Sequence, residues 1–339
     1  MKQYLLPRGA TSADQLRIVE VPQPRPGRGE VLVQVKACSL NFRDQMIASG
    51  KYVGSVAEDT VPLSDGVGEV IEVGAEATLF RPGDRVAGLF FQEWLDGPVP
   101  ADRGRSLGES GSPGMLAEFV VLPETGVVRL ASSLEYAEAA TLPCAGVTAW
   151  NALLEGPRPV GPGRTVLVLG TGGVSLLALQ LAAAAGARVF VTSASDAKLE
   201  RARALGAAGG LNYTKVPEWG AHAAAWTGCG GFDHVVEVGG AGTLAQSMAA
   251  LACGGEIALI GLLSSKALEG GLLALAMKGG SIRGIGVGSR AMAQRLHRAV
   301  DANAIRPVVD RVFPFAEARE AYRYQASAAL FGKVVISIG

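Results

Sequence analysis

The sequence predicts an α/β protein that combines a mostly-β unit with a doubly wound parallel sheet. Its 339 residues exceed the size of one ordinary compact domain. The first third is rich in short β-type segments separated by Gly, Pro and Asp. From about residue 146, apolar strand-like segments alternate with Ala- and Leu-rich helical segments. Alternation of this kind predicts parallel strands covered by helices on both faces.

The composition indicates a globular protein without a strongly charged partner. Hydrophobic residues make up 49% and charged residues 18%, which is ample material for buried cores. Lys and Arg together number 31, as do Asp and Glu, so a nucleic acid or an anionic membrane is not an expected partner. The four cysteines are scattered without a CxxC spacing, and the first residues lack an apolar run typical of a signal peptide. We therefore expect a cytoplasmic protein.

Within the first unit, four segments have the pattern of strands. A long segment rich in Gly, Pro and Ser, 91–115, follows the third of them. Loops of this length are often functional, but a mobile surface insertion is equally consistent with the composition. Trp94 is its most informative residue, since a tryptophan is costly to expose. The expected strands are 30–37, 67–74, 84–90 and 117–123.

The second unit is expected to contain six strands, with helices between the first strands and at 241–252. Residues 166–187 carry almost no charge, as a membrane span would, but a Gly cluster after five residues favours a buried strand followed by a packed helix. After 288 come a helix, further strand-like and helical segments, and a closing strand at 333–338, which we expect to return to the first unit. The expected strands are 165–170, 187–193, 208–213, 234–239, 255–261 and 281–288. The expected domains are 1–145 with 289–339, and 146–288.

The clearest motif is VLVLGTGGVSLLALQ, in which Gly170, Thr171, Gly172, Gly173 and Val174 end a strand and open a helix. The first glycine permits a tight turn, and the second lets backbone N–H groups approach a pyrophosphate at the helix N-terminus. The last position of the G-x-G-x-x-G pattern holds Ser175, which is small enough for close packing. The strand–turn–helix context supports dinucleotide binding in a Rossmann domain.

The residues at the end of the next expected strand favour NADP(H) over NAD(H). NAD sites place a carboxylate there to accept a hydrogen bond from the ribose 2′-OH. Here Thr192 and Ser193 occupy the position, and Lys198 follows nearby, so a 2′-phosphate would meet hydroxyls and a cation instead. The alternative is that Lys198 simply lies on a solvated face of the helix. Asp196 is the only competing acid, and we expect it to be a helix N-cap.

The chain resembles the medium-chain dehydrogenase/reductase superfamily over essentially its whole length, and within it the zinc-independent quinone oxidoreductase-like branch. The resemblance implies a GroES-like catalytic domain at both chain ends, a Rossmann domain between them, and a homodimer formed through 281–288. The motifs that carry it are SLNFRD (39–44), DGVGEV (65–70), RPGDRV (81–86), LPCAGVTAWNAL (142–153), GTGGVS (170–175) and FGKVVI (331–336).

The same resemblance predicts that no metal is bound. Zinc-dependent members supply ligands from a Cys, a His and a later Cys, and the matching positions here are Asn41, Ser64 and Cys144. Asn and Ser are poor zinc ligands, and one thiolate cannot complete a tetrahedral site. Cys144 is then most simply a small buried hydrophobic residue. Residues 91–115 also lack the four cysteines of the structural zinc lobe.

Without a metal, hydride transfer is easiest to an acceptor that delocalises the developing charge, such as a quinone or an α,β-unsaturated carbonyl. SLNFRDQMIASGKY also resembles the enoyl-reductase domains of polyketide synthases. That resemblance implies that Asn41 orients the nicotinamide and that Tyr52 is the proton donor, with Asp44 and Arg43 as second candidates. Each has a plainer alternative: Asn41 as a helix N-cap, Asp44 as a local cap or ion-pair partner, and Tyr52 as a wall residue.

Further residues match family positions near the cofactor, although Lys333 is equally consistent with a surface lysine at a strand end. None of the three histidines can be assigned a role, because His234 begins a strand and the other two fall in polar helical segments. The remaining expected cofactor-binding residues are Thr148, Tyr213, Val238, Gly239, Gly261, Leu262, Val287 and Lys333.

Together these observations predict an NADPH-dependent, zinc-free oxidoreductase that acts on a small quinone or activated C=C substrate. An NADP-dependent alcohol or aldehyde dehydrogenase and a non-catalytic NADPH-binding protein are the alternatives.

Overall fold

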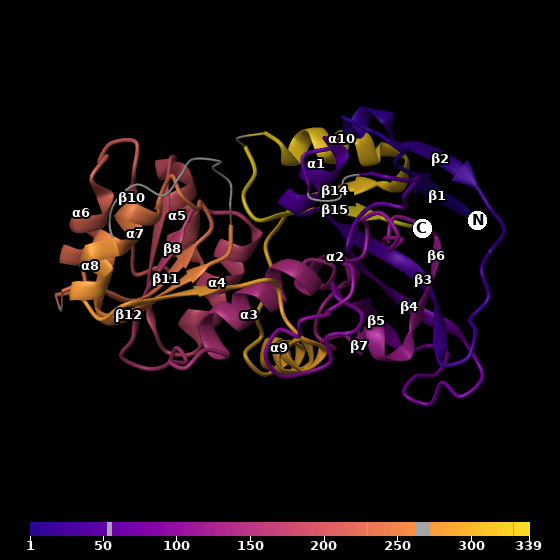
Figure 1. Cartoon of the computed structure of the whole chain (residues 1–339), viewed down its shortest axis with the longest axis horizontal. Coiled ribbons are helices and arrows are strands. Elements are labelled where there is room, and N and C mark those ends of the chain that lie inside the picture. The colour runs from indigo at the N-terminus through magenta and orange to yellow at the C-terminus, as the bar shows by residue number, and fades with distance from the viewer. Residues whose placement is uncertain (53–55, 229, 262–271, 328) are drawn as a thin grey trace. The chain divides into compact units, whose positions relative to one another are not determined.

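The computed structural model describes residues 1–52, 56–228, 230–261, 272–327 and 329–339. The chain divides into two compact units (Figure 1). The first consists of Met1–Val147 and Gly288–Gly339, and the second of Thr148–Val287. The boundaries expected from the sequence were 145/146 and 288/289.

The first unit is mostly β, as predicted. Strands β1 and β2 form an antiparallel pair, and seven further strands form one sheet in the order β14-β15-β3-β4-β5-β7, with β6 also paired to β3. The strands are β1 (Lys2–Leu5), β2 (Arg17–Glu20), β3 (Glu30–Ser39), β4 (Asp65–Val73), β5 (Arg85–Gly88), β6 (Phe119–Pro123), β7 (Val127–Arg129), β14 (Val309–Pro314) and β15 (Lys333–Ser337).

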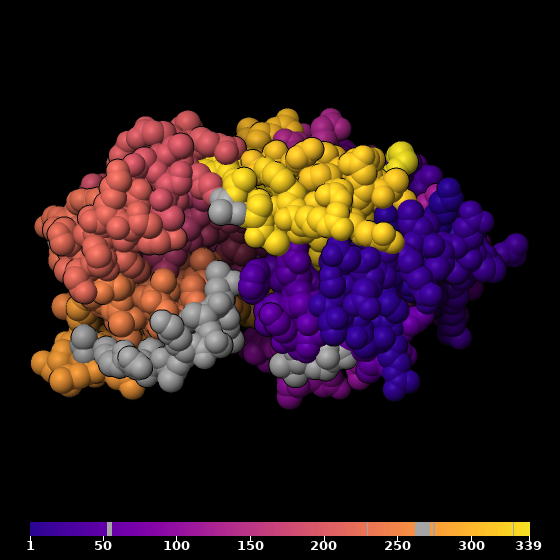
Figure 2. All heavy atoms as spheres, turned by 90° about the horizontal axis from the view of Figure 1, so that it is seen from above, coloured from indigo at the N-terminus to yellow at the C-terminus, as the bar shows by residue number. Residues whose placement is uncertain are grey.

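The closing strand β15 lies antiparallel to the end of β3, with Val335 opposite Ser39 and Ile336 opposite Cys38. In Figure 2 the yellow C-terminal residues accordingly lie against indigo N-terminal residues of the same unit. The return of the chain end places the start of β15 beside the segment that leaves β3. The paired ends of both strands are almost entirely buried there.

The helices of the first unit are short, and the longest of them is α9. His297 on α9 is buried, and its Nδ1 accepts a hydrogen bond from the Ala131 N–H at 3.1 Å. His297 thus lies in a polar helical segment, as expected, but on the buried side of that helix. Burial lowers its pKa to about 4, so it remains neutral at physiological pH. The helices are α1 (Phe42–Ala48), α2 (Tyr136–Ala139), α9 (Arg290–Ala302) and α10 (Ala318–Gln325), with a π-helical turn at Leu142–Gly146; α3 (Val147–Leu154) begins at the boundary between the units.

The second unit is a parallel six-stranded sheet in the order β10-β9-β8-β11-β12-β13. In this doubly wound order, successive strands are added outward on one side from β8 to β10 and on the other side from β11 to β13. It confirms the predicted fold class. The strands are β8 (Thr165–Leu169), β9 (Arg188–Ser193), β10 (Gly209–Asn212), β11 (Phe232–Glu237), β12 (Leu251–Leu259) and β13 (Ser281–Gly284), and the helices are α4 (Gly173–Ala184), α5 (Asp196–Ala204), α6 (Trp219–Ala225), α7 (Leu244–Ala250) and α8 (Leu272–Met277).

Most strand boundaries in this unit differ from the expected ones by one or two residues, and two differ by four. Strand β12 already begins at Leu251, inside the helix expected at 241–252, because Leu251 pairs with Phe232 of β11. Strand β13 ends at Gly284, four residues before the expected end, and Val287 adopts a left-handed backbone conformation that a strand cannot contain. The apolar segment 166–187 consists of most of β8, a Gly turn and α4, and no helix in the described part of the chain is long and apolar enough to cross a membrane.

A buried carboxylate holds the end of β11 against the start of α7. Glu237 is fully buried and accepts hydrogen bonds from the N–H groups of Gly239 and Gly240, at 2.7 and 3.0 Å. It also accepts from the hydroxyls of Thr243, at 2.6 Å, and Ser247. Four donors aimed at one carboxylate compensate for its removal from water.

We expect Glu237→Ala to lower the free energy of unfolding of the second unit by about 3 kcal/mol, because four buried donors lose their acceptor. Denaturant unfolding of the full chain measures this. Glu200→Ala is the matched control, since the Glu200 side chain is 67% exposed and pairs with Arg203 of its own helix. Equal losses of unfolding free energy in the two variants would contradict the stabilising role assigned to Glu237.

Candidate active site

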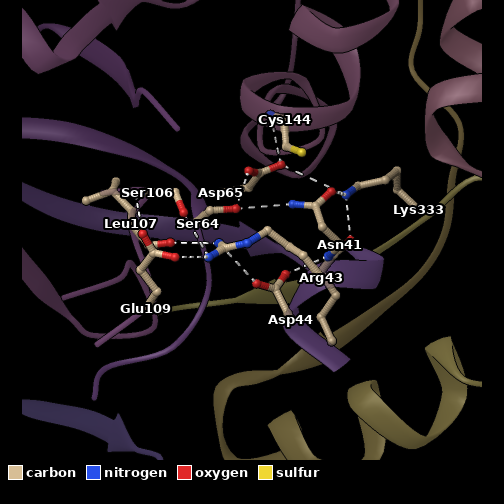
Figure 3. A network of polar contacts seen from close by, with 11 residues as sticks. Asn41, Arg43, Asp44, Ser64, Asp65, Ser106, Leu107, Glu109, Cys144 and Lys333 are labelled. Carbon is tan, nitrogen blue, oxygen red and sulfur yellow. Dashed lines mark hydrogen bonds and ion pairs between the residues drawn. The ribbon is translucent and has the colours of Figure 1, made fainter. Parts of the chain in front are cut away.

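Each unit contains one cluster of the residues singled out by the sequence. In the second unit they gather at the carboxyl ends of the parallel strands. In the first unit they form a buried polar network around the start of α1 (Figure 3).

The glycine motif of the second unit forms the expected strand–turn–helix connection. Strand β8 ends at Leu169, Gly170 has a φ of +73°, and Gly172 is the N-cap of α4, which begins at Gly173. A Cβ placed on Gly170 or on Gly172 would meet no protein atom within 4 Å. This open space beside a helix N-terminus fits the pyrophosphate of a dinucleotide. Ser175 is buried and donates from its hydroxyl to the Leu169 carbonyl at 2.7 Å, which fastens the helix to the strand.

Other expected cofactor-binding residues follow the ends of the strands and therefore lie at one edge of the parallel sheet. Gly261 has no room for a side chain, because its Cβ would lie 1.8 Å from the Val238 carbonyl oxygen. Leu262 lies outside the described residues. The residues at this edge are Thr171, Val174, Ser193, Tyr213, Val238, Gly239 and Gly261.

Val287 is held in an unfavourable backbone conformation. Its φ is +61°, which is rare for a β-branched residue. The Asn151 side chain donates from Nδ2 to the Val287 carbonyl at 2.7 Å and stabilises this conformation. Thr148, one turn before Asn151 on α3, is buried.

The end of β9 presents hydroxyl groups. Thr192 and Ser193 are buried there, and Lys198 is half-buried on the first turn of α5. The expectation that Asp196 caps α5 was wrong: Ser195 is the N-cap, and its hydroxyl accepts from the Lys198 N–H. The carboxylate of Asp196 instead binds the Asn212 amide at 2.9 Å and the Lys215 ammonium at 2.6 Å, because both side chains come from the neighbouring strand end.

In the first unit, four side chains form a closed ring of polar contacts, which we call the polar ring: Asn41, Ser64, Asp65 and Lys333 (Figure 3). The Lys333 ammonium donates to Asn41 Oδ1 at 2.6 Å, and Asn41 Nδ2 donates to Ser64 Oγ at 3.3 Å. Ser64 donates to Asp65 Oδ1 at 2.9 Å, and Asp65 Oδ2 lies 3.9 Å from the Lys333 ammonium. The Cys144 N–H also donates to Asp65 Oδ2, at 3.2 Å.

All four members of the polar ring are buried. Lys333 is only 5% exposed, so its interpretation as a surface lysine is wrong. Asn41 is the N-cap residue of α1, but its amide makes no capping bond and contacts Lys333 and Ser64 instead. Asp65 belongs to the motif DGVGEV, yet no role was predicted for it from the sequence. The carboxylate at the start of this motif was the signal that could have identified it.

Asp44 and Arg43 extend the network away from the polar ring. Asp44 caps α1 by accepting from the Asn41 N–H at 2.7 Å, and it lies 3.6 Å from Arg43. The Arg43 guanidinium lies over the rings of Phe90 and Tyr52, at 4.8 and 5.3 Å from their centres. Tyr52 is partly buried against the core of this unit. The local role of Asp44 is thus present in the structure, and Tyr52 packs between the core and Arg43.

Arg43 also fixes part of the long segment 91–115. It donates to the Leu107 carbonyl at 2.7 Å and the Ser106 hydroxyl at 3.0 Å, and it lies 3.7 Å from Glu109. Trp94 of the same segment is buried. These contacts make 91–115 part of the packed site. Ser106 and Glu109 were not predicted from the sequence, because nothing in their local pattern indicates contact with a residue more than sixty positions earlier.

Burial controls the protonation of the acidic groups here. Desolvation raises the pKa of Asp44 to about 6, although the charge of Arg43 opposes it. Burial likewise raises the pKa of Asp65, against the opposing effect of the Lys333 ammonium. Cys144 is partly exposed and not the buried residue expected; its surroundings raise the pKa of its thiol, chiefly by desolvation.

The side chains at the three zinc-ligand positions do not fit a zinc ion. Asn41 and Ser64 are hydrogen-bonded to each other, and the Asn41 oxygen faces an ammonium group. In the described part of the chain, no three His, Cys, Asp or Glu side chains are close enough to hold a metal. Of the three positions, only Cys144 offers a ligand of the kind that zinc prefers, and one thiolate cannot complete a tetrahedral site.

Comparison with known proteins agrees with this architecture. Residues 27–132 match the family model of the alcohol dehydrogenase GroES-like domain, and residues 173–302 match that of zinc-binding dehydrogenase. A zinc-type alcohol dehydrogenase-like protein from Schizosaccharomyces pombe is 44% identical over 343 residues, covering 99% of each chain. The crystal structure of an NAD-dependent alcohol dehydrogenase is 34% identical, with a TM-score of 0.89 and full coverage of both chains.

A 2-methylene-furan-3-one reductase from Solanum lycopersicum is 29% identical over 336 residues, which cover 96% of this chain and 76% of the reductase. With these similarities, the fold and the glycine motif confirm the predicted resemblance. The chain belongs to the medium-chain dehydrogenase/reductase superfamily, whose members are nicotinamide-dinucleotide-dependent oxidoreductases.

The raised pKa of Asp44 predicts a pH dependence of stability. In the unfolded chain Asp44 loses its proton near its usual pKa of 3.8, whereas in the folded chain it retains the proton to about pH 6. The contribution is therefore fully present below the unfolded pKa and is lost as the pH rises through 6. Relative to Asp44→Asn, the native chain should lose stability on the order of 3 kcal/mol between about pH 4 and about pH 7. Urea unfolding at both pH values measures the difference.

Asp59 supplies a control of opposite sign. The Arg8 N–H and the Arg17 side chain lower the pKa of this exposed carboxylate, so its contribution is lost as the pH falls. Relative to Asp59→Asn, the native chain should therefore gain stability as the pH rises towards the usual pKa of 3.8, and the difference should stay nearly level between about pH 4 and about pH 7. Identical pH profiles for the native chain and Asp44→Asn would show that folding does not raise the pKa of Asp44.

Proposed function

We propose that this protein is an NADPH-dependent oxidoreductase that reduces quinones or α,β-unsaturated carbonyl compounds without a metal ion. The observation that carries the proposal is the polar ring. Two of its side chains, Asn41 and Ser64, occupy positions at which the zinc-dependent members of the superfamily bind their metal, and the ring satisfies its own hydrogen bonds. A carbonyl substrate would then meet hydrogen-bond donors instead of a Lewis acid.

The substrate class follows from the replacement of a Lewis acid by hydrogen-bond donors. When bound, NADPH supplies a hydride. Addition of the hydride to the β-carbon of an enone moves the C=C electrons to the carbonyl oxygen and forms an enolate, and a proton then adds at the α-carbon. A quinone similarly takes one hydride and one proton to give a hydroquinone. We assign the orientation of the nicotinamide to Asn41 and proton donation to Tyr52, with Asp44 as the second candidate donor.

The preference for NADPH is supported by the end of β9. Ser193 occupies the position at which an acid would bind the ribose of NAD, and Lys198 lies in the first turn of α5. Asp196, the competing acid, is engaged by Asn212 and Lys215. A dianionic 2′-phosphate would be attracted by these lysines, and residues 188–195, all of them described, contain no carboxylate to oppose it.

Two names among the relatives point to different substrates. The Solanum lycopersicum relative is named as a reductase of 2-methylene-furan-3-one, a ketone with an adjacent C=C bond, which supports the proposal. The Schizosaccharomyces pombe relative is named as an alcohol dehydrogenase-like protein, so reversible oxidation of alcohols is the second candidate function. Binding of NADPH without catalysis is the third outcome that the test distinguishes.

We expect NADPH to be consumed with 1,4-quinones or 2-alkenals, and at an unchanged rate after treatment with a chelator, because the described residues offer no three His, Cys, Asp or Glu side chains placed to bind a metal. Simple aldehydes and saturated ketones are the matched control substrates and should react slowly or not at all. NADPH absorbance measures the rate in each case. Turnover of simple aldehydes alone, abolished by chelation, would favour the alcohol dehydrogenase function; tight NADPH binding without any turnover would favour a binding protein.

A charge reversal tests the cofactor preference. Lys198→Glu should raise the KM for NADPH by about 10-fold or more while leaving that for NADH nearly unchanged, since only the 2′-phosphate is repelled. Lys51→Glu, at an exposed lysine of the first unit, controls for the change in net charge. An unaltered ratio of the two KM values would remove Lys198 from the cofactor site.

A further inference from the structure

A largely buried ion pair connects the last two strands of the second unit. The Glu256 side chain on β12 is only 2% exposed, and its carboxylate accepts from Arg283 Nε on β13 at 3.0 Å. Arg283 lies opposite Ala258 in this parallel pair. Residues two apart on a strand point to the same face, so Glu256 and Arg283 meet on one face of the sheet. The carboxylate thus fixes one edge of the guanidinium.

The other edge of the Arg283 guanidinium binds the C-terminal end of α3. Its Nη2 donates to the Asn151 and Ala152 carbonyls, at 2.9 and 3.0 Å, and its Nη1 donates to the Asn151 side-chain oxygen at 3.0 Å. A cation is favourable at a helix C-terminus, where the last carbonyls lack partners within the helix. Arg283 therefore holds both the backbone and the side chain of Asn151.

The Asn151 amide can adopt only one orientation between its two neighbours. A guanidinium can only donate, so the amide atom that faces Arg283 must be the oxygen. The amide nitrogen then faces the Val287 carbonyl and donates to it at 2.7 Å. Asn151 is buried, so water has little access to replace either hydrogen bond. The pair of Glu256 and Arg283 thus determines that Asn151 presents a donor to Val287.

Val287 is the residue whose backbone depends on this donor. It lies three residues after the end of β13, and its φ of +61° is unfavourable for a β-branched side chain. Of the described residues other than glycine that have a positive φ, it is the only β-branched one. A hydrogen bond to its carbonyl fixes the peptide plane that follows this φ. Asn151 therefore stabilises a conformation that the valine would not adopt by itself.

The position of Val287 along the sheet relates it to one half of a dinucleotide. A doubly wound sheet binds one mononucleotide at the carboxyl ends of each of its halves. The glycine turn after β8 and the hydroxyl groups at the end of β9 belong to the half expected to bind the adenosine part. The other half consists of β11, β12 and β13, and Val287 follows the last of these strands. We therefore expect the nicotinamide part on the side of Val287.

We propose that Asn151 is a positioning residue for the nicotinamide half of the cofactor: oriented by Arg283 and Glu256, its amide holds the Val287 backbone in the conformation that receives this half. The inference rests on the proposed function only in that a nicotinamide dinucleotide binds. It is independent of the substrate and of the choice between NADPH and NADH. A purely structural hydrogen bond would instead affect every ligand of the second unit equally.

The test compares whole dinucleotides with fragments that lack the nicotinamide. Asn151→Asp preserves the size of the side chain and its contact with Arg283, which keeps the new carboxylate ionised, but it has no N–H group for the Val287 carbonyl. Calorimetry measures the dissociation constants of NADPH and NADH, and of 2′-phospho-ADP-ribose and ADP-ribose. We expect those of both dinucleotides to rise about 10-fold, while those of the two fragments stay unchanged.

Two further variants control this comparison. Asn303→Asp should change no dissociation constant, because the exposed Asn303 amide likewise donates to a backbone carbonyl, that of Ala299, far along the chain from β13. Glycine adopts a positive φ without being held. In a chain that already carries Val287→Gly, Asn151→Asp should therefore leave the affinity for both dinucleotides nearly unchanged.

Three results would each overturn the inference: unchanged dinucleotide affinity in Asn151→Asp, equal weakening of dinucleotides and fragments, or the same loss with and without Val287→Gly. Thermal unfolding verifies that each variant is folded, and Asn151→Ser replaces Asn151→Asp in the same scheme if the latter is not. Loss of folding in both would assign Asn151 a purely structural role and also overturn the inference. Because affinity is measured without a substrate, a failure to reduce quinones or enones would leave this test unaffected.

Discussion

The contact between the Lys333 ammonium and the Asp65 carboxylate is the interaction on which the first unit depends most. At 3.9 Å and an effective dielectric constant near 20, their attraction is about 4 kcal/mol before desolvation is subtracted. Desolvation of two buried ions consumes much of that gain. The value of the pair therefore lies less in net stability than in the cost of losing one partner, which would leave a single charge inside the protein. The pair couples the C-terminal strand β15 to the start of β4.

The helix α1 shows how local structure follows from this arrangement. It has only seven residues, and a helix of this length is unstable in water on its own. Three polar side chains near its N-terminus bind three different partners. Asn41 joins the polar ring, Arg43 binds the segment 91–115, and Asp44 caps the helix itself. The first turn of α1 is thereby bound to β15 and to the segment 91–115, which are both distant from it in sequence.

A structural feature could be predicted from the sequence where neighbouring residues determine it, and not where distant residues do. The glycine turn at 170–173 and the parallel strands follow from nearby residues, and both were predicted with small errors at their ends. The role of Asp196 was misjudged because two neighbours compete to cap α5, and Ser195 is placed one residue earlier. The contact of Lys333 with Asn41 spans 292 residues, and no local pattern distinguishes a buried lysine at a strand start from an exposed one. Only the return of the chain end, which brings β15 beside β3, decides that question.

The polar ring can be buried because its charges balance. A zinc ion held by two thiolates and a neutral imidazole has no formal net charge, and so can be buried at modest cost. Lys333 and Asp65 together are also formally neutral. Each set of charges is neutral by itself, so charge balance does not decide between them. The identity of the side chains at positions 41 and 64 and the hydrogen bonds that they make decide instead. Substituting Asn41 or Ser64 alone would lose the hydrogen bonds of one arrangement without gaining the metal of the other.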